Sequence, residues 1–385
     1  MEDVLEKYLR YAGYSVNRVM NITDVGHLTS DADQGEDKML KGARREHKTV
    51  MEIARYYTDA FFEDCRKLNI KRPDAVQPAT GLIDDYIKII TKLLDTGYAY
   101  LAGGNIYFDT SKLQRYYIFN DHNEEDLAVG VREGVEEDTN KRNKNDFVLW
   151  FTKSKFEDQA LKWDSPWGVG YPGWHIECSA MSNRYLGKTI DIHCGGSDLA
   201  FPHHENEIAQ SEAANGCKFV NYWLHNGFIN IDNKKMSKSL GNGVDPADIF
   251  NENGADILRL WAASADYHAD VRCSKASFQQ LSQNYLKFRN TCKFMLDNLV
   301  DFDPEKLTKP EDMPVLDRWL LTKLNELIEK AEQSYCDYEF HIITHAVNDF
   351  CVNTLSSFYL DIVKDRLYCE GAESATRRSA QTALY

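Results

Sequence analysis

Residues 234–242 place three lysines, two serines and a glycine in one short polar segment, Lys-Lys-Met-Ser-Lys-Ser-Leu-Gly-Asn. Lys235 and Lys238 lie on either side of Ser237, and a loop of this composition can close over a triphosphate. A lysine ammonium is a mobile positive charge, and stabilising charge on phosphate oxygens is most of what phosphate chemistry requires. A loop that closes on a substrate and later releases the product is a common gating device. An isolated Lys-x-x-Lys pattern is more often a solvated basic turn, so the meaning of this segment depends on the residues around it.

A second group of residues has the types and spacing of a metal site. His203 and Glu207 are four positions apart, so that on a helix their side chains share one face. Cys178, on a different predicted element, can supply a thiolate, and Cys, His and Glu together are a zinc ligand set. A lone His-x-x-x-Glu pair is more often a helix-surface pair, but with Cys178 the pattern indicates zinc. The other candidate ligands within reach are His175, Cys194, His204 and Glu205.

Both groups need secondary structure that brings distant residues together. Residues 16–22 alternate as a strand that ends in Asn21-Ile22-Thr23-Asp24, and ligands lie at the carboxyl ends of strands in an open α/β sheet. Residues 191–198 are expected to form a strand that runs into a glycine turn, and a helix is expected to start at residue 201 with Pro202 in its first turn. The remaining predicted elements are helices at 1–15, 45–72, 81–97 and 173–181, strands within 98–109 and at 147–150, and an exposed charged segment at 120–145.

Length and composition indicate a globular protein of two or three domains. The chain has 385 residues, of which 27% are charged and 43% hydrophobic, and no apolar run approaches the roughly 18 residues of a membrane span. The first residues do not resemble a signal peptide, and nine scattered cysteines suit reduced thiols, so we expect a cytoplasmic protein. The net charge of −15 neither supports nor excludes tRNA, because an acidic enzyme can bind RNA through local basic patches and shape.

Several segments of the chain resemble cysteinyl-tRNA synthetase, a class I aminoacyl-tRNA synthetase. The resemblance covers about residues 1–243 and includes the Lys-Met-Ser-Lys-Ser segment, which is the second signature of class I synthetases. It implies an α/β fold, a Rossmann-type class I catalytic domain over residues 1–243 with a charged insertion near residues 98–150. The segments that carry the resemblance are 21–39, 173–181, 191–198, 201–210 and the start of the signature loop.

The resemblance also implies the roles of individual residues. Cys178, His203 and Glu207 are implied to be ligands of one zinc ion, which binds the thiolate of the substrate cysteine. A soft metal binds thiolate far better than hydroxyl, so such a site rejects serine without editing. The amino-acid pocket is implied to contain Thr23, Trp174, His193 and Asp198, and the ATP-binding loop Lys235, Met236, Ser237, Lys238 and Ser239. No further catalytic side chain is implied.

The implied reaction is that of a cysteine–tRNA ligase. Cysteine and ATP, with Mg²⁺, give cysteinyl-adenylate and pyrophosphate, and the cysteinyl group then passes to the terminal ribose of tRNA(Cys). The expected partners are cysteine, ATP and tRNA, with no membrane and no partner protein. Two family features that belong upstream, the His-Ile-Gly-His signature and a further zinc-binding cysteine, are not in this sequence. We therefore expect an N-terminally truncated catalytic domain that is impaired in catalysis, because the missing helix N-terminus cradles the ATP phosphates.

Residues 244–385 resemble a different family, isoleucyl-tRNA synthetase. The segments that carry this resemblance are 254–261, 269–272, 348–361 and 364–368. It implies a linker and stem-contact region at residues 244–290 and an incomplete helical anticodon-binding domain at residues 291–385. Helical periodicity is consistent with an all-α bundle and is found at residues 277–300, 314–336 and 340–368.

The change of resemblance falls near residues 236–250, where both families share the signature loop. We hypothesise that the chain joins two genes at this homologous stretch, by recombination or by an error of sequence assembly. An isoleucine–tRNA ligase fragment is an alternative. However, isoleucine has no use for zinc, and the large editing insertion of that family is absent from this sequence. A further alternative is a ligase that joins cysteine to an amino sugar. Such an enzyme has no need of an anticodon domain, so the helical C-terminal region argues against it. A non-catalytic fusion that binds zinc, cysteine or tRNA is the remaining alternative.

Overall fold

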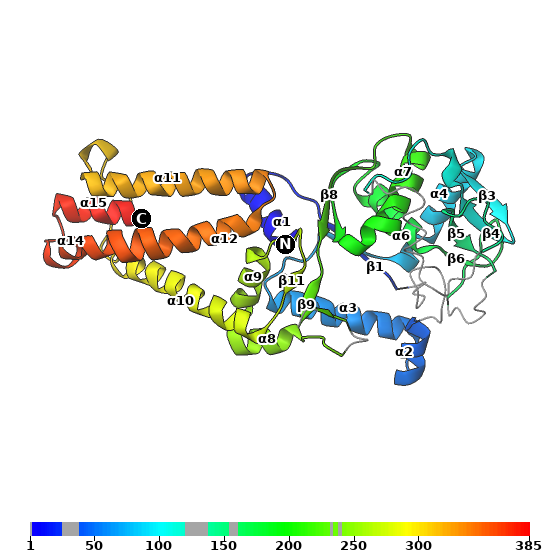
Figure 1. The fold of residues 1–385 in the computed structure, drawn as a ribbon, viewed down its shortest axis with the longest axis horizontal. Coiled ribbons are helices and arrows are strands. Elements are labelled where there is room, and N and C mark those ends of the chain that lie inside the picture. Colours follow the sequence, from blue (N-terminus) through cyan, green and yellow to red (C-terminus); the bar gives the residue numbers. More distant parts are fainter. Residues whose placement is uncertain (1, 25–37, 120–137, 154–160, 232–233, 238–240) are drawn as a thin grey trace. The chain divides into compact units, whose positions relative to one another are not determined.

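The computed structural model describes residues 2–24, 38–119, 138–153, 161–231, 234–237 and 241–385 (Figure 1). These residues form two compact units, an N-terminal unit of residues 2–226 and a C-terminal unit of residues 227–385. Within the described part of the chain, each helix is too short or too polar to span a bilayer. The two units are described separately below.

The N-terminal unit contains two pairs of parallel strands. Strand β1 (Val19–Ile22) pairs with β2 (Ala75–Pro78), and β7 (Ile190–Gly196) pairs with β8 (Val220–Asn226). Parallel strands need a crossover connection, and here helices α3 (Val50–Lys67) and α7 (Glu205–Asn215) lie within the two crossovers. The strands predicted at 16–22 and 191–198 are therefore confirmed, each with a slightly different start.

An antiparallel sheet forms the rest of the strand structure in this unit. Its strand order is β3-β4-β5-β6, and its members are β3 (Ala99–Ala102), β4 (Asn105–Phe108), β5 (Phe147–Phe151) and β6 (Tyr171–Pro172). Gly103 and Gly104 have φ values of 58° and 98°, which glycine adopts at no steric cost, so they form the tight turn of the predicted strand pair. The insertion predicted near 98–150 thus includes part of a sheet, and residues 120–137 lie outside the described residues.

Three helices pack against each other and against this sheet (Figure 1). They are α4 (Ile83–Asp95), α6 (Trp174–Tyr185) and α7. The core between them and the sheet includes Tyr86, Ile90, Phe108, Trp150 and Ile176, all of which are almost completely buried. Strand β5 is buried on both faces, which explains why its sequence is a continuous apolar run without alternation. This core fixes α6 and α7, the two helices that carry the candidate site.

The C-terminal unit starts with a small sheet and continues as helices. Strand β9 (Ile229–Ile231) lies between β10 (Lys234–Lys235) and β11 (Val271–Arg272). The helices that follow are α8 (Pro246–Asn253), α9 (Ala255–Ser264), α10 (Lys275–Asp297), α11 (Val315–Cys336), α12 (Phe340–Asp349), η7 (Phe350–Tyr359), α13 (Leu360–Ile362), α14 (Lys364–Cys369) and α15 (Ala375–Leu384). The helices predicted at 277–300 and 314–336 are α10 and α11, while the one predicted at 340–368 is divided into α12, η7, α13 and α14.

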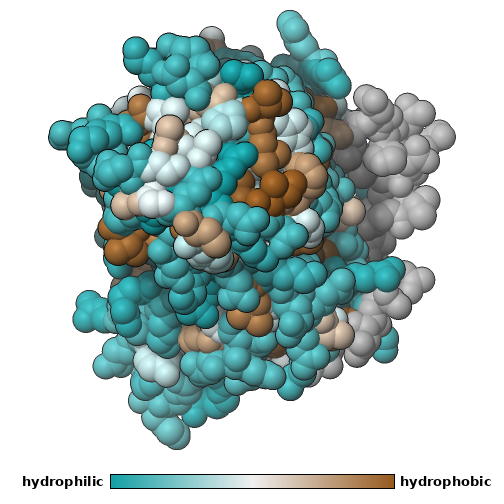
Figure 2. Space-filling view, turned by 90° about the vertical axis from the view of Figure 1, so that its left-hand side faces the viewer, coloured by the Kyte–Doolittle hydropathy of each residue, from teal (hydrophilic) through white to brown (hydrophobic). Residues whose placement is uncertain are grey.

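The helical part of this unit encloses a separate apolar core. Leu320, Leu355, Tyr359, Val363 and Ala380 lie in it, contributed by α11, η7, α15 and the turn before α14. The space-filling view of this end of the bundle shows a largely hydrophilic surface on which hydrophobic residues gather in a few patches (Figure 2). The bundle is thus held by its own core and can be described without reference to the N-terminal unit.

Candidate metal and substrate site

Cys178, His203 and Glu207 meet in the interior of the N-terminal unit. The Cys178 Sγ atom lies 3.6 Å from Nε2 of His203, and the same nitrogen lies 2.7 Å from Oε1 of Glu207. All three residues are buried, with exposed fractions of 9%, 3% and 0%. One ligand atom from each residue lies within 4.8 Å of the others, which is the size of a mononuclear metal site.

The two helices place these residues for local reasons. Helix α6 starts directly after Gly173, where a side chain would come within 2.1 Å of the Val148 carbonyl oxygen on β5. Only glycine permits this close approach, which sets the path of the helix that carries Cys178. The helix predicted to start at residue 201 is formed by the end of η4 (Ala200–His204), which continues directly into α7 at Glu205. Phe201 itself has extended backbone angles, with φ −132° and ψ 133°, so the helical backbone begins just after it, in agreement with Pro202 in the first turn.

The Glu207 carboxylate lies between two histidines. Both of its oxygens are buried, and each lies 2.7 Å from a histidine Nε2 atom, Oε1 from that of His203 and Oε2 from that of His193. Nitrogen and sulfur ligands of a tetrahedral zinc ion are about 3.3–3.8 Å apart, given bond lengths of about 2.0–2.3 Å. The Cys178–His203 distance fits this spacing, while the His203–Glu207 distance is that of a hydrogen bond, so it is the chemical types of the three donors that suit a zinc ion.

The electrostatics of the three groups point the same way. Burial raises the pKa of the Cys178 thiol, and the negative charge of Glu207 raises it further. Burial also acts to raise the pKa of Glu207, but the charges of His193 and His203 outweigh it and hold this pKa well below its usual range. A metal ion at this site would supply a positive charge beside the Cys178 thiol and the Glu207 carboxylate.

His175 lies behind His203. Its Nδ1 atom is 2.9 Å from Nδ1 of His203, and burial, assisted by the charge of His203, lowers the pKa of His175 well below its usual value. A neutral His175 can therefore hold the far side of the His203 ring, which leaves Nε2 of His203 facing Cys178 and Glu207. Such contacts commonly fix the orientation of a histidine that binds a metal. His175 was considered from the sequence as a ligand, but the structure places its Nδ1 atom against His203.

Three of the four predicted pocket residues lie beside this cluster. Trp174 stacks on His203 with ring centroids 4.2 Å apart. Asn21 connects Thr23 to the cluster, because its amide lies 3.3 Å from Oγ1 of Thr23 and 3.8 Å from the Cys178 sulfur. His193 contacts the second oxygen of Glu207, and this carboxylate raises the pKa of His193 although burial acts in the opposite direction.

Asp198 is placed differently from the other predicted pocket residues. It follows β7 in the short turn η3 (Ser197–Leu199) and is exposed. The Asp198 carboxylate lies against the backbone of Gly196, so that a Cβ atom added to Gly196 would come within 2.4 Å of Oδ1 of Asp198. The role of Asp198 in a pocket stays a prediction.

Trp223 and His225 on β8 belong to the same cluster and were not predicted. Parallel pairing places Trp223 opposite His193 and His225 opposite Gly195. The Trp223 indole stacks on His193 with ring centroids 4.6 Å apart, and Nε2 of His225 lies 2.7 Å from Nδ1 of His204. Burial lowers the pKa of His204 to about 3. The sequence signal for these residues is the alternation of Trp223 and His225 on the strand that follows α7.

The signature loop belongs to the C-terminal unit. Lys235 ends β10, the Met236 N–H donates to the Ile229 carbonyl at 2.8 Å, and the Ser237 N–H donates to Oδ1 of Asn242 at 2.8 Å. Lys238 and Ser239, the other predicted ATP-binding residues, lie outside the described residues. The described part of the loop therefore continues from the end of the β9–β10 hairpin, and the side chain of Asn242 accepts a hydrogen bond from it.

Comparison with known proteins identifies two families of domains. Residues 1–283 match the model of the class I (C) tRNA synthetase catalytic domain, and residues 317–385 match the anticodon-binding domain of tRNA ligases. The cysteine–tRNA ligase of Treponema denticola is 50% identical over 301 residues, which cover 78% of this chain and 61% of that protein. The cysteine–tRNA ligase of Borrelia hermsii is 39% identical over 366 residues, which cover 94% of this chain and 73% of that protein.

Solved structures support the same fold at low sequence identity. Methionyl-tRNA synthetase of Mycobacterium tuberculosis, in complex with methionyl-adenylate, has a TM-score of 0.73 at 17% identity, over 100% of this chain and 83% of that one. A putative arginyl-tRNA synthetase of Campylobacter jejuni has a TM-score of 0.62 at 13% identity, with the same coverage. The expected fold class, a class I synthetase catalytic domain followed by a helical anticodon-binding region, is confirmed.

The comparisons also bear on the predicted join of two genes. The catalytic-domain match continues to residue 283, and the similarity to the Borrelia hermsii ligase extends over 94% of the chain. A join near residues 236–250 is therefore not needed to account for the C-terminal residues. The chain spans about three fifths of the length of the first relatives, 61% in the case of Treponema denticola.

Proposed function

The chain belongs to the cysteine–tRNA ligase family of class I aminoacyl-tRNA synthetases, and from this premise we propose that it activates cysteine with ATP and transfers it to tRNA(Cys). The observation that carries the proposal is the buried group of Cys178, His203 and Glu207. Thiolate, imidazole and carboxylate in one dry site suit a soft divalent metal, and cysteine is the amino acid whose side chain such a metal binds best.

The proposed amino-acid site follows from the residues around this group. Cys178, His203 and Glu207 would hold one zinc ion, which when bound supplies Lewis acidity and a strong preference for thiolate over hydroxyl. Trp174 covers the His203 ring and limits the space next to it. Thr23 and Asn21, at the carboxyl end of β1, provide a hydroxyl and an amide near the cluster. Polar groups at this end of a parallel strand are well placed to orient a small ligand.

The proposed ATP site uses the signature loop. Lysine ammonium groups in this loop, Lys235 in the described structure and Lys238 beyond it, would stabilise the negative charge that develops on the phosphates as pyrophosphate leaves. Mg²⁺ would accompany ATP as part of the substrate. The helices of residues 317–385 match an anticodon-binding domain and would contact tRNA. No side chain needs to form a covalent bond with the substrate.

The first test is amino-acid-dependent exchange of pyrophosphate into ATP. We expect cysteine to support exchange and serine and isoleucine not to, because neither offers a thiolate. Exchange with isoleucine in place of cysteine would favour the isoleucine–tRNA ligase reading. Zinc and tRNA binding without exchange for any amino acid would favour a non-catalytic binding role and would contradict the proposal.

A further inference from the structure

The ammonium of Lys235 lies over the ring of Phe228, with Nζ 3.7 Å from the ring centroid. This distance is within the range of a cation–π contact. We propose that Phe228 is a positioning residue, which holds the first lysine of the signature loop in a defined place before ATP binds. The inference rests on the proposed function, because ATP is the ligand that Lys235 is to meet.

Phe228 is itself firmly held. Its N–H donates to Oδ1 of Asp270 at 3.0 Å, and its carbonyl accepts from the Val271 N–H at 2.6 Å. The preceding Gly227 packs so closely that an added Cβ would come within 2.4 Å of the Ala269 carbonyl oxygen. The Phe228 ring is therefore attached to a backbone that has little freedom to move.

The backbone of Lys235 is fixed from the other side of the hairpin. Lys235 pairs with Asn230 in the β9–β10 ladder, and its carbonyl accepts from the Asn242 side-chain amide at 3.2 Å. Asp270 also takes part here, because its Oδ2 atom accepts from the Asn230 side chain at 2.9 Å. One carboxylate thus holds both Phe228, directly before β9, and Asn230 within β9, the strand that pairs with the strand of the lysine.

Holding Lys235 in this way affects how well it can bind a phosphate. A free lysine side chain has many rotamers and loses much conformational entropy when its ammonium is fixed on a ligand. A lysine that already rests on an aromatic ring has less entropy to lose. A purely structural Phe228 would need only its apolar volume, which leucine also supplies.

The test separates the contact from its effect on ATP. Lysines are dimethylated with ¹³C, which preserves their charge, and the Lys235 resonance is assigned by its loss in Lys235→Arg. Ring current should shift this resonance upfield in the unsubstituted protein and in Phe228→Tyr, and the shift should vanish in Phe228→Leu. ATP binding to the unmodified proteins is measured in parallel. We expect Phe228→Leu to weaken ATP binding about two- to five-fold, the value of an exposed cation–π contact.

Matched controls define the outcomes. Phe228→Tyr keeps the ring, and Tyr368→Leu removes an exposed aromatic from α14, so both should bind ATP as the unsubstituted protein does. If the Lys235 resonance of the unsubstituted protein has the chemical shift of an ordinary lysine, the contact is overturned, whether or not the Phe228 variants fold. Unchanged ATP binding by Phe228→Leu would overturn the positioning role. An upfield Lys235 resonance in a protein that binds no ATP would refute the proposed function while the contact itself stood.

Discussion

At the scale of single residues, the protonation state of Cys178 depends most on whether a cation lies beside it. Its thiol is buried, and burial together with the nearby Glu207 charge raises its pKa well above the usual value. A thiol in these surroundings stays protonated and inert unless a cation offsets the Glu207 charge. Because metal binding displaces a thiol proton, a zinc ion at this site would hold Cys178 as a thiolate.

Replacement of Cys178 by serine tests this assignment. We expect Cys178→Ser to reduce bound zinc from about one ion per chain to near zero, because a hydroxyl is a poor ligand for zinc. Bound metal is measured after dialysis against buffer without metal. Cys217→Ser, at an exposed cysteine outside the cluster, is the matched control and should retain its zinc. Equal zinc content in the two variants would show that Cys178 is not a ligand.

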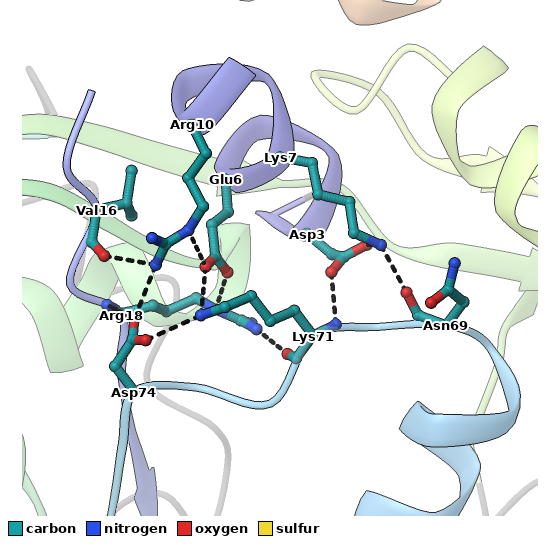
Figure 3. Close-up of polar contacts among 9 residues, drawn as sticks. All are labelled: Asp3, Glu6, Lys7, Arg10, Val16, Arg18, Asn69, Lys71 and Asp74. Atoms are coloured by element: carbon teal, nitrogen blue, oxygen red, sulfur yellow. Dashed lines mark hydrogen bonds and ion pairs between the residues drawn. The ribbon is translucent and has the colours of Figure 1, made fainter. Parts of the chain in front are cut away.

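At the scale of elements, a charged network attaches helix α1 (Glu2–Tyr11) to the start of β1 (Figure 3). Glu6 is 3% exposed and forms ion pairs with Arg10 at 2.9 Å, Arg18 at 2.7 Å and Lys71 at 2.8 Å. Burial acts to raise the pKa of Glu6, but hydrogen bonds from Lys71 and Arg10 and the charge of Arg18 outweigh it, so this pKa is lowered. Arg18 precedes β1 directly, so the network fixes the strand that ends at Asn21 and Thr23.

Removing the Glu6 charge should destabilise the protein in a pH-dependent way. Glu6→Gln leaves three cations without their shared carboxylate, and we expect a loss of about 2–4 kcal/mol in the free energy of unfolding at pH 7. Because the folded pKa of Glu6 lies below its ordinary value of 4.5, its stabilisation is present above that pH and is lost as the pH falls through the folded pKa. The difference between the two proteins should therefore shrink below pH 4.5.

Urea unfolding at pH 7 and at about pH 3.5 measures this difference. Glu63→Gln is the matched control, since Glu63 forms an exposed ion pair with Arg66 at 2.7 Å and its replacement should change stability little. If Glu6→Gln behaved as this control at pH 7, the network would have no role in holding α1.

At the scale of the whole molecule, the described candidate metal and pocket residues all lie in the N-terminal unit, while the helical unit has its own buried polar centre. That centre is Asp317 on α11, which is completely buried. Its carboxylate accepts hydrogen bonds from Tyr359 at 2.8 Å, Ser379 at 2.6 Å and Arg366 at 3.1 Å. These donors come from η7, α15 and α14, so one side chain connects four helical segments.

Asp317→Ala should damage the helical unit and leave the metal site intact. Loss of a buried, hydrogen-bonded charge that is paired with arginine destabilises a protein by about 3–5 kcal/mol. Circular dichroism during thermal unfolding measures the loss, and zinc content is determined on the same sample. Asp361→Ala, at an exposed aspartate paired with Lys364, serves as the control and should change little. Loss of zinc from folded Asp317→Ala protein would contradict the separation of the two functions.

The sequence by itself determined the residue types of the candidate site and the elements with strong periodicity. His203 and Glu207 share a face because they are four positions apart, a relation set within one helical turn. The strand at Phe147–Phe151 and the turn at Gly103 and Gly104 follow from an apolar run and from glycine conformations, which are also local. The fold class followed from motifs in the same way, since the signature loop and the segments around it are contiguous.

Only the tertiary structure decided what surrounds these residues. Trp223 and His225 reach the cluster through the register of two parallel strands that are distant in sequence, and register depends on packing between elements. His175 faces Nδ1 of His203 because α6 packs on α7, and helix α7 starts after residue 201 because Phe201 is extended. Local periodicity predicts contacts within a turn or a hairpin, but contacts between distant segments are set by how whole elements pack in the core.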